Sequence, residues 1–287
     1  MSSSGSTNAG QVMISDEDLQ NFCEFLYRKT GLRFDDKKRY YLERRLSERV
    51  RDIGASNFRE YLSLLHTDQN EKELQMVVNS MTVNETYFFR EQYQFDCLVR
   101  NLMPEVTKRR RRQNDRISIW SVPCSTGEEP YSIAIWLLDK WAQADDFEIE
   151  IHASDIDSTV LARARRGVYE ARALHLVPSD IRKRYFHQIA EERWQIIDEL
   201  RESIEFSLVN IASAAQTWKF REFDVIFCRN LLIYFDEVSR RQAVEMFYES
   251  LSPGGFVCLG HSESMSRISS LFIPRKFPDA LVYQKPL

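Results

Sequence analysis

The sequence predicts an α/β protein with a mostly parallel sheet, preceded by a smaller all-helical domain. Two observations carry this prediction. Beyond residue 91, short apolar runs that indicate buried strands alternate with amphipathic helical segments, a pattern typical of βαβ units. Before residue 82, helical periodicity recurs four times, and no strand pattern interrupts it. A chain of 287 residues is long enough for two domains.

Composition and charge narrow the possible functions. A formal net charge of −4 argues against general affinity for nucleic acid. No apolar run approaches the ~20 residues of a membrane-spanning helix, and residues 1–13 lack the features of a signal peptide and are predicted to be a disordered tail. The five cysteines form no C-x-x-C pair and the five histidines show no metal-ligand spacing. We therefore expect reduced thiols, a cytoplasmic location and no metal.

Residues 14–81 are predicted to form the helical domain. Apolar positions at helical spacing indicate four short helices. Ser15 is placed to cap the first helix, and Gly31 and Gly54 are placed to end the first and second.

The second of these helices is unusually basic. At about 100° per residue, Lys38, Arg45 and Arg49 fall on one line beside the apolar stripe, and Lys37, Arg44 and Arg51 fall on another. Such a run is often only a solvated helix face. Because this helix has an excess of positive charge although the protein as a whole is acidic, the pattern favours a docking site for an acidic partner.

Residues 82–91 link the helical part to the α/β part. Two adjacent phenylalanines, Phe88 and Phe89, are flanked there by polar residues. The segment is either a packed linker or a lid over a ligand, because domain junctions are common ligand sites.

The α/β part, residues 92–287, opens with the stretch from Arg116 to Leu138. A short strand, a turn ending at Gly127 and a helix from Glu128 form the first unit of a Rossmann-like, nucleotide-binding sheet. One glycine, no lysine and two glutamates do not suit a dinucleotide or a P-loop phosphate. They suit a ligand with a sugar, an ammonium or a sulfonium, such as S-adenosylmethionine. The alternative is an ordinary βα unit whose glutamates cap a helix.

The next strand, residues 147–154, ends at Asp155, which is placed to bind ribose hydroxyls or, alternatively, to start the following helix. Further strands are expected at 203–208, 223–228 and 256–259, with a last edge strand at 280–284. Ligands in open α/β sheets bind beyond the carboxyl ends of the strands, so the residues expected to line the site are Asn210, Arg229, Asn230 and Tyr234.

Residues from about 167 to 202 break the alternation of strands and helices. A short helix is expected from Pro178 and a strand near Trp194, which together predict a small β subdomain inserted into the α/β domain.

At this point the motifs resemble one family closely, the CheR chemotaxis-receptor methyltransferases. The matching segments occur in the family's order and span both domains: N-E-T-Y-F-F-R-E at 84–91, C-S-T-G-E-E-P-Y-S at 124–132, A-S-D-I-D at 153–157, F-C-R-N-L-L-I-Y-F-D at 227–236 and G-H-S-E at 260–263.

The resemblance implies a Rossmann-like S-adenosylmethionine methyltransferase that esterifies glutamate side chains on the cytoplasmic signalling helices of chemoreceptors during chemotactic adaptation, with S-adenosylhomocysteine as the product. It implies a cytoplasmic enzyme recruited to membrane receptor arrays. Nothing in the sequence suggests an obligate dimer, so we expect a monomer. The cofactor contacts that it implies are Asn84, Thr86, Arg90, Glu129, Asp155, Asn210, Ile211, Arg229, Asn230 and Leu231.

The resemblance also assigns catalytic and docking roles. Arg90 and Tyr234 resemble the family's residues nearest the transferred methyl group, and the basic second helix resembles its receptor-docking helix, notably at Arg45, Arg49 and Arg51. Some members use the inserted subdomain to hold a peptide at the receptor's C-terminus through a glycine-containing loop. Residues 186–193 contain no glycine, which argues against such tethering.

Two other functions stay open on the sequence. One is a methyltransferase for a small molecule or nucleic acid, which the α/β part alone would allow. The other is a non-catalytic module that binds S-adenosylmethionine as a sensor or scaffold.

Overall fold

The computed structural model describes residues 12–34, 36–67, 71–109, 116–265, 268–278 and 280–287. The chain divides into two compact units, one up to Val83 and one from Asn84. The division falls inside the segment predicted as a linker.

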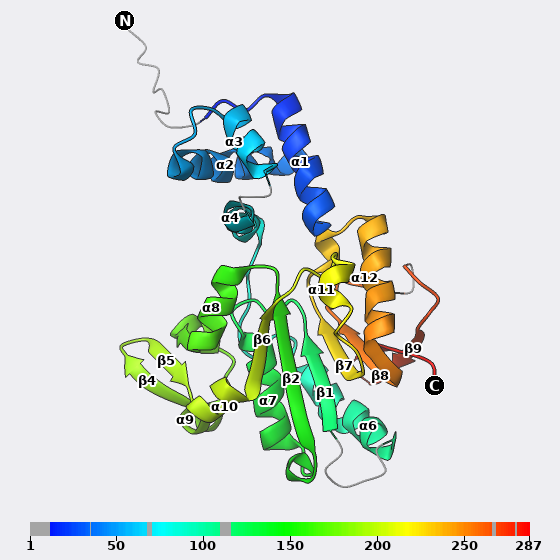
Figure 1. Ribbon diagram of the computed structural model, residues 1–287. Coiled ribbons are helices and arrows are strands. Elements are labelled where there is room, and N and C mark those ends of the chain that lie inside the picture. Colours follow the sequence, from blue (N-terminus) through cyan, green and yellow to red (C-terminus); the bar gives the residue numbers. More distant parts are fainter. Residues whose placement is uncertain (1–11, 35, 68–70, 110–115, 266–267, 279) are drawn as a thin grey trace, which may run out of the picture. The chain divides into compact units, whose positions relative to one another are not determined.

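The first unit contains the four predicted helices, α1 (Asp16–Thr30), α2 (Arg39–Ile53), α3 (Phe58–Leu65) and α4 (Glu71–Met81), with a 3-10 turn, η1 (Asp36–Lys38), before α2 (Figure 1). The Ser15 hydroxyl accepts a hydrogen bond from the Asp18 N–H, and Gly31 and Gly54 end their helices with φ of 73° and 75°. The predicted caps are confirmed, and they work because glycine adopts the left-handed conformation without a Cβ clash.

The second unit is built on a seven-stranded sheet in the order β6-β2-β1-β7-β8-β10-β9 (Figure 1). Its first five strands run parallel to one another, and β10 pairs antiparallel with both β8 and β9. The strands are β1 (Arg116–Ser121), β2 (Glu148–Asp155), β6 (Ile204–Leu208), β7 (Phe223–Cys228), β8 (Leu251–Leu259), β9 (Ile273–Lys276) and β10 (Leu281–Gln284).

Helices cover both faces of this sheet. On one face, Ile119 and Phe227 belong to the core shared with the helices that precede and follow β1. On the opposite face, the Trp120 ring stacks on Phe220 and contacts Phe247 of α12. This alternation follows from the two-residue period of a strand. The helices are α5 (Tyr93–Cys97), the π-helix η3 (Leu98–Leu102), α6 (Met103–Arg109), α7 (Glu128–Lys140), η4 (Ala144–Asp146), α8 (Ser158–Arg166), α11 (Ala214–Thr217), η6 (Leu232–Tyr234) and α12 (Glu237–Ser250).

The predicted insertion is a small subdomain with a three-stranded antiparallel sheet in the order β3-β5-β4. Residues 186–193 are mostly strand, and a two-residue turn, Glu191–Glu192, joins β4 to β5, with Glu192 at φ 56°. The elements are β3 (Val168–Glu170), η5 (Ala171–Leu174), α9 (Ser179–Tyr185), β4 (Phe186–Ala190), β5 (Arg193–Ile196) and α10 (Asp198–Ser203).

Two predictions about the end of the sheet are wrong. The strand at 281–284 is not an edge strand, because β9, which the sequence pattern did not reveal, pairs with its outer side. In addition, β8 begins at Leu251 rather than at Phe256. Gly254 and Gly255 lie within β8, and their backbones exchange hydrogen bonds with Lys285 of the C-terminal segment. Both errors concern pairing between strands, of β9 with β10 and of Leu251 with Phe223 of β7, which local periodicity does not specify.

Candidate active site

The turn after β1 forms one wall of the candidate site. The Ser125 N–H donates to the Asp155 carboxylate at 2.8 Å and the Cys124 N–H to the Ser154 carbonyl at 2.9 Å, so the turn is fixed to the end of β2. Gly127 has φ 96°, and a Cβ there would lie 3.0 Å from the Ala164 Cβ. The turn therefore requires glycine both for its conformation and for its packing.

Asp155 lies at the carboxyl end of β2, as predicted, and is 3% exposed. Its two oxygens accept the N–H groups of Ser125 and Asp157. Burial raises the pKa of Asp155 to about 6, although these two hydrogen bonds favour the charged form. The Ile156 N–H also favours the charged form. A carboxylate offers about four acceptor positions, so Asp155 is still able to accept a ligand hydroxyl.

Asn84 is fixed beside this strand end. Its side-chain amide donates to the Asp157 carboxylate at 2.9 Å, and Asp157 also caps α8 through the Thr159 N–H. The first residue of the predicted linker motif is thereby bound to Asp157, whose own N–H donates to the Asp155 carboxylate.

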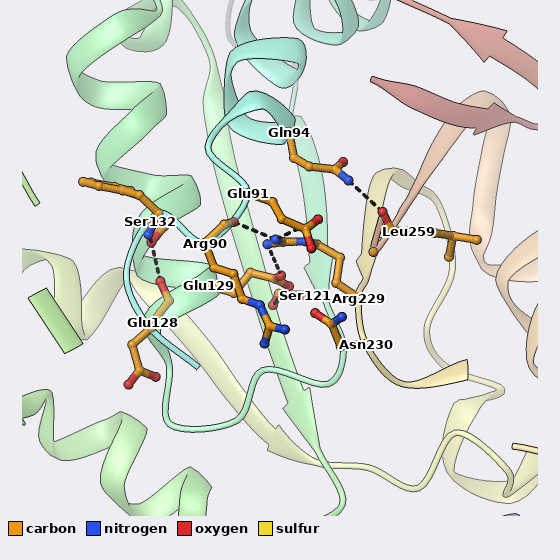
Figure 2. A network of polar contacts seen from close by, with 12 residues as sticks. Arg90, Glu91, Gln94, Ser121, Glu128, Glu129, Ser132, Arg229, Asn230 and Leu259 are labelled. Atoms are coloured by element: carbon orange, nitrogen blue, oxygen red, sulfur yellow. Dashed lines mark hydrogen bonds and ion pairs between the residues drawn. The ribbon is translucent and has the colours of Figure 1, made fainter. Parts of the chain in front are cut away.

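Arg229, which directly follows β7, is the centre of a buried polar network (Figure 2). Its side chain is 3% exposed, and its guanidinium donates to the Glu129 carboxylate at 2.8 Å and forms an ion pair with the Glu91 carboxylate at 3.2 Å. It also donates to the Arg90 carbonyl at 2.6 Å. One side chain thus joins β7, the first turn of α7 and the segment 84–91.

The charges in this network depend on one another. Burial raises the pKa of Glu129, and the neighbouring Arg229 charge only partly opposes this. Burial also acts to raise the pKa of Glu91, but the Arg229 charge and hydrogen bonds from His261 and Tyr93 outweigh it, so that pKa lies below its usual value. Burial opposes the charge on Arg229, and the two carboxylates more than compensate and raise its pKa. The ion pairs offset part of the cost of holding the Arg229 charge and the two largely buried carboxylates away from water.

The segment that carries Arg90 is held at successive residues. The Phe88 N–H donates to the Ala173 carbonyl of the inserted subdomain, and the Phe89 N–H to the Ser132 hydroxyl of α7. Phe89 and Glu91 have φ of 60° and 56°. Such left-handed residues cost about 1–2 kcal/mol each, and the surrounding hydrogen bonds offset this strain.

The Arg90 side chain makes contacts separate from those of its backbone, whose carbonyl accepts from Arg229. Its guanidinium donates to the Glu85 carbonyl at 2.9 Å and lies 5.8 Å from the centre of the Tyr87 ring. Burial raises the pKa of the half-buried Tyr234, and the Arg90 charge acts in the opposite direction. The two predicted catalytic side chains are therefore electrostatic neighbours, and Tyr234 is a neutral hydroxyl at pH 7.

The loop after β7 is fixed by Glu263. Its carboxylate accepts the N–H groups of Asn230, Leu232 and Gly260 at 2.8, 2.7 and 2.8 Å. Asn230 has φ 59°, and this clamp holds that conformation.

The remaining predicted cofactor residues lie around the same strand ends. The Asn210 side chain accepts the Ala212 N–H at 3.0 Å, so it also shapes its own loop, and Ile211 is buried. Thr86 and Leu231 are half-buried.

Several residues of the site were not predicted. Glu91 and Ser132 join the segment 84–91 to the sheet, and Glu263 holds the loop after β7. All three lie inside the motifs that carry the family resemblance, which was the only signal for them in the sequence.

The predicted docking residues belong to the first unit and differ in their surroundings. Arg49 forms a two-pronged ion pair with the buried Glu73 at 3.0 and 2.5 Å, and its side chain is 14% exposed. It therefore joins α2 to α4. Arg45 lies 4.2 Å from the Tyr41 ring, Lys38 lies 5.6 Å from the Phe34 ring, and Arg51 is exposed.

The described residues show neither a metal-binding cluster nor a membrane-spanning helix. No group of three or more histidine, cysteine, aspartate or glutamate side chains could hold a metal ion there. No helix in that part of the chain is long and apolar enough to cross a membrane.

Comparisons with known proteins identify the family. Residues 17–82 match the all-alpha domain of CheR methyltransferases, and residues 84–280 match their SAM binding domain. The chain belongs to the CheR methyltransferase family. It is 45% identical to chemotaxis protein methyltransferase 2 of Vibrio cholerae, over 96% of this chain and 95% of that protein. It is 36% identical to the chemotaxis protein methyltransferase of Salmonella typhimurium, over 90% of this chain and 87% of that protein, and 35% identical to that of Escherichia coli K12, over 92% and 90%.

The residues present fit the cofactor that a CheR SAM binding domain takes. Beside the turn the site has a buried carboxylate, Asp155, and a largely buried one, Glu129, and the turn contains no lysine. In the described part of the chain, the Arg229 Nε is a buried donor without a hydrogen-bond partner. A buried donor next to carboxylates suits the zwitterionic amino-acid end of S-adenosylmethionine, and Asp155 suits its ribose. Family membership and this donor set agree that the chain is an S-adenosylmethionine-dependent methyltransferase.

Proposed function

We propose that this enzyme transfers the methyl group of S-adenosylmethionine to glutamate side chains on the cytoplasmic signalling helices of chemoreceptors, and so forms glutamate methyl esters and S-adenosylhomocysteine. The similarity to chemotaxis protein methyltransferases over nearly the whole chain supports a role in chemotaxis. A carboxylate acceptor is favoured by the arginines of the site.

The observation that carries this proposal is the contrast between the two arginines. Arg229 is buried between Glu91 and Glu129. Among the residues that the structure describes, by contrast, no carboxylate forms an ion pair with Arg90, whose guanidinium contacts the Glu85 carbonyl and the Tyr87 ring. The fork of an arginine matches a carboxylate. Arg90 is therefore suited to bind an incoming carboxylate.

The chemistry requires little from the protein beyond alignment. When bound, S-adenosylmethionine supplies a methyl group on a positively charged sulfur. A glutamate carboxylate is already ionised at pH 7, so the enzyme needs no general base. Arg90 would orient the acceptor carboxylate, the neutral Tyr234 hydroxyl would donate a hydrogen bond along its approach, and the buried network behind them would exclude water.

The basic helix α2 is proposed to dock the receptor. The receptor's methylation helices present several glutamates. The positive charge of α2 would attract these negative side chains and accelerate the encounter of the two proteins. Because Arg49 is engaged by Glu73, the proposed docking residues are Lys38, Arg45 and Arg51. The association rate should fall steeply as salt is added. An Arg45→Glu/Arg51→Glu variant should associate more slowly and with a weaker salt dependence, and identical salt slopes for variant and wild type would remove this role.

The inserted subdomain is proposed not to tether a receptor C-terminal peptide. In this chain the β4–β5 connection is only the two-residue turn Glu191–Glu192. Calorimetry with a peptide of the receptor's C-terminus should show no tight binding, and tight binding would refute this part of the proposal.

The substrate is tested by transfer of labelled methyl groups to receptor cytoplasmic fragments. Two fragments are compared, one with its native glutamates and one with those glutamates replaced by alanine. The proposal predicts label only in the native fragment. Equal labelling of both, or labelling of neither while cofactor binding persists, would overturn it.

A further inference from the structure

The inserted subdomain reaches the cofactor turn through one side chain, Tyr169 of β3. Its hydroxyl donates to the Thr126 carbonyl at 2.9 Å, in the turn that begins α7. The side chain is 5% exposed. Tyr169 therefore contacts the turn from an element that is not part of the seven-stranded sheet.

The contact is tight on both sides of the turn. A Cβ at Gly127 would lie only 3.0 Å from the Tyr169 hydroxyl and 3.1 Å from the Tyr131 ring. Burial raises the pKa of Tyr169 well above its usual value, so the hydroxyl remains a donor at every working pH. Thr126, the residue just before Gly127, thus has Tyr169 as a fixed hydrogen-bond partner.

The Tyr169 ring also supports the segment that carries Arg90. It meets the Phe88 ring edge-on at a centroid distance of 4.8 Å, and Phe88 meets Phe186 of β4 in the same way at 5.1 Å. The Phe88 N–H donates to the Ala173 carbonyl of η5. The subdomain therefore holds the cofactor turn through the hydroxyl of Tyr169 and the segment 84–91 through its ring.

We propose that Tyr169 is a positioning residue for the cofactor, which sets the Thr126–Gly127 turn and the start of α7 from the inserted subdomain without touching the reacting atoms. The inference rests on the placement of S-adenosylmethionine at this turn and is independent of which side chain is methylated. The inserted subdomain would then contribute to cofactor binding whatever the methyl acceptor is.

The test is Tyr169→Phe, which removes the hydroxyl and keeps the ring. The matched control is Tyr131→Phe, because Tyr131 is also buried and also donates one hydrogen bond to a carbonyl, that of Ala164 in α8 rather than one in the turn. Binding of S-adenosylhomocysteine is measured by calorimetry on the full chain, and thermal unfolding is measured for the same samples without ligand.

One hydrogen bond contributes about 1 kcal/mol, which corresponds to roughly a fivefold change in an equilibrium constant. We expect Tyr169→Phe to raise the Kd for S-adenosylhomocysteine and the KM for S-adenosylmethionine about fivefold, with kcat and the KM for the receptor fragment within about twofold of wild type. The control should lose similar thermal stability and bind the product like wild type. An unchanged Kd in Tyr169→Phe, or equal losses of affinity in both variants, would overturn the proposal. Wild type that binds no product at all would instead contradict the cofactor placement.

Discussion

Replacing Arg229 by methionine would remove the cation that holds the site together. The guanidinium is 3% exposed and contacts the carboxylates of Glu91 and Glu129 and the carbonyl of Arg90. Methionine fills much of the volume but leaves two largely buried carboxylates, Glu91 and Glu129, without their partner. Because breaking a buried ion pair typically destabilises a protein by about 3–5 kcal/mol, we expect a loss of about 4 kcal/mol near pH 8.

The loss should depend on pH with a definite sign. Burial already raises the pKa of Glu129, and it will also raise that of Glu91 once the Arg229 charge no longer outweighs it. A carboxyl whose folded pKa lies above its unfolded value takes up a proton on folding. Its contribution is therefore largest below the unfolded pKa and is lost as the pH rises through the folded pKa. The destabilisation of Arg229→Met should be smaller at pH 5 than at pH 8, by about 1–2 kcal/mol.

Urea denaturation of the full chain at the two pH values measures both effects. The matched control is Arg172→Met, because Arg172 also lies beside a carboxylate but is 90% exposed. It should change the free energy of unfolding by less than about 0.5 kcal/mol at either pH. A destabilisation by Arg229→Met as small as that of the control, or one that is the same at pH 5 and pH 8, would refute the reasoning.

Three further predictions concern turnover, cofactor affinity and the helical unit. Arg90→Ala should lower kcat by about 100-fold or more with an unchanged melting temperature, and near-normal turnover would remove Arg90 from the proposed catalytic group. Burial raises the pKa of both Asp155 and Glu128 to about 6, and a ligand hydroxyl requires the ionised form of Asp155. The Kd for S-adenosylhomocysteine should therefore be constant above about pH 7 and rise about tenfold by pH 5. The control variant Glu128→Gln, which lacks the other carboxyl with a raised pKa, should show the same pH dependence as wild type. A pH-independent Kd would contradict the role of Asp155. Arg49→Ala should destabilise the chain by about 3 kcal/mol, because it leaves Glu73 buried and unpaired, whereas Arg45→Ala should change stability by less than about 1 kcal/mol; equal effects in denaturation would show that Arg49 is not structural.

Most of the architecture was predictable because local signals agree with the fold. Ser15 and Gly31 bound α1 through cap chemistry that acts within a few residues. The turn at Gly127 follows from one glycine between a buried strand and an amphipathic helix. In each case the physical cause lies within one element, so the sequence pattern contains it.

The parts that could not be predicted depend on contacts between distant residues. The edge position of β9 depends on its pairing with β10, and the start of β8 on the pairing of Leu251 with Phe223 of β7. The Arg229 network joins residues that are 100 or more positions apart in the sequence. Charge periodicity also grouped Arg49 with Arg45, because it cannot show that Glu73 of another helix neutralises only one of them.

The central claim is that the acceptor is a carboxylate, and the stability of the product bond tests this most directly. Receptor fragment labelled by the enzyme with methyl groups from S-adenosylmethionine is purified and treated with mild base. A methyl ester is hydrolysed under these conditions, so our account predicts that the label is released as volatile methanol. Label that stays on the protein after base treatment would show methylation at nitrogen or another stable position and would contradict the account.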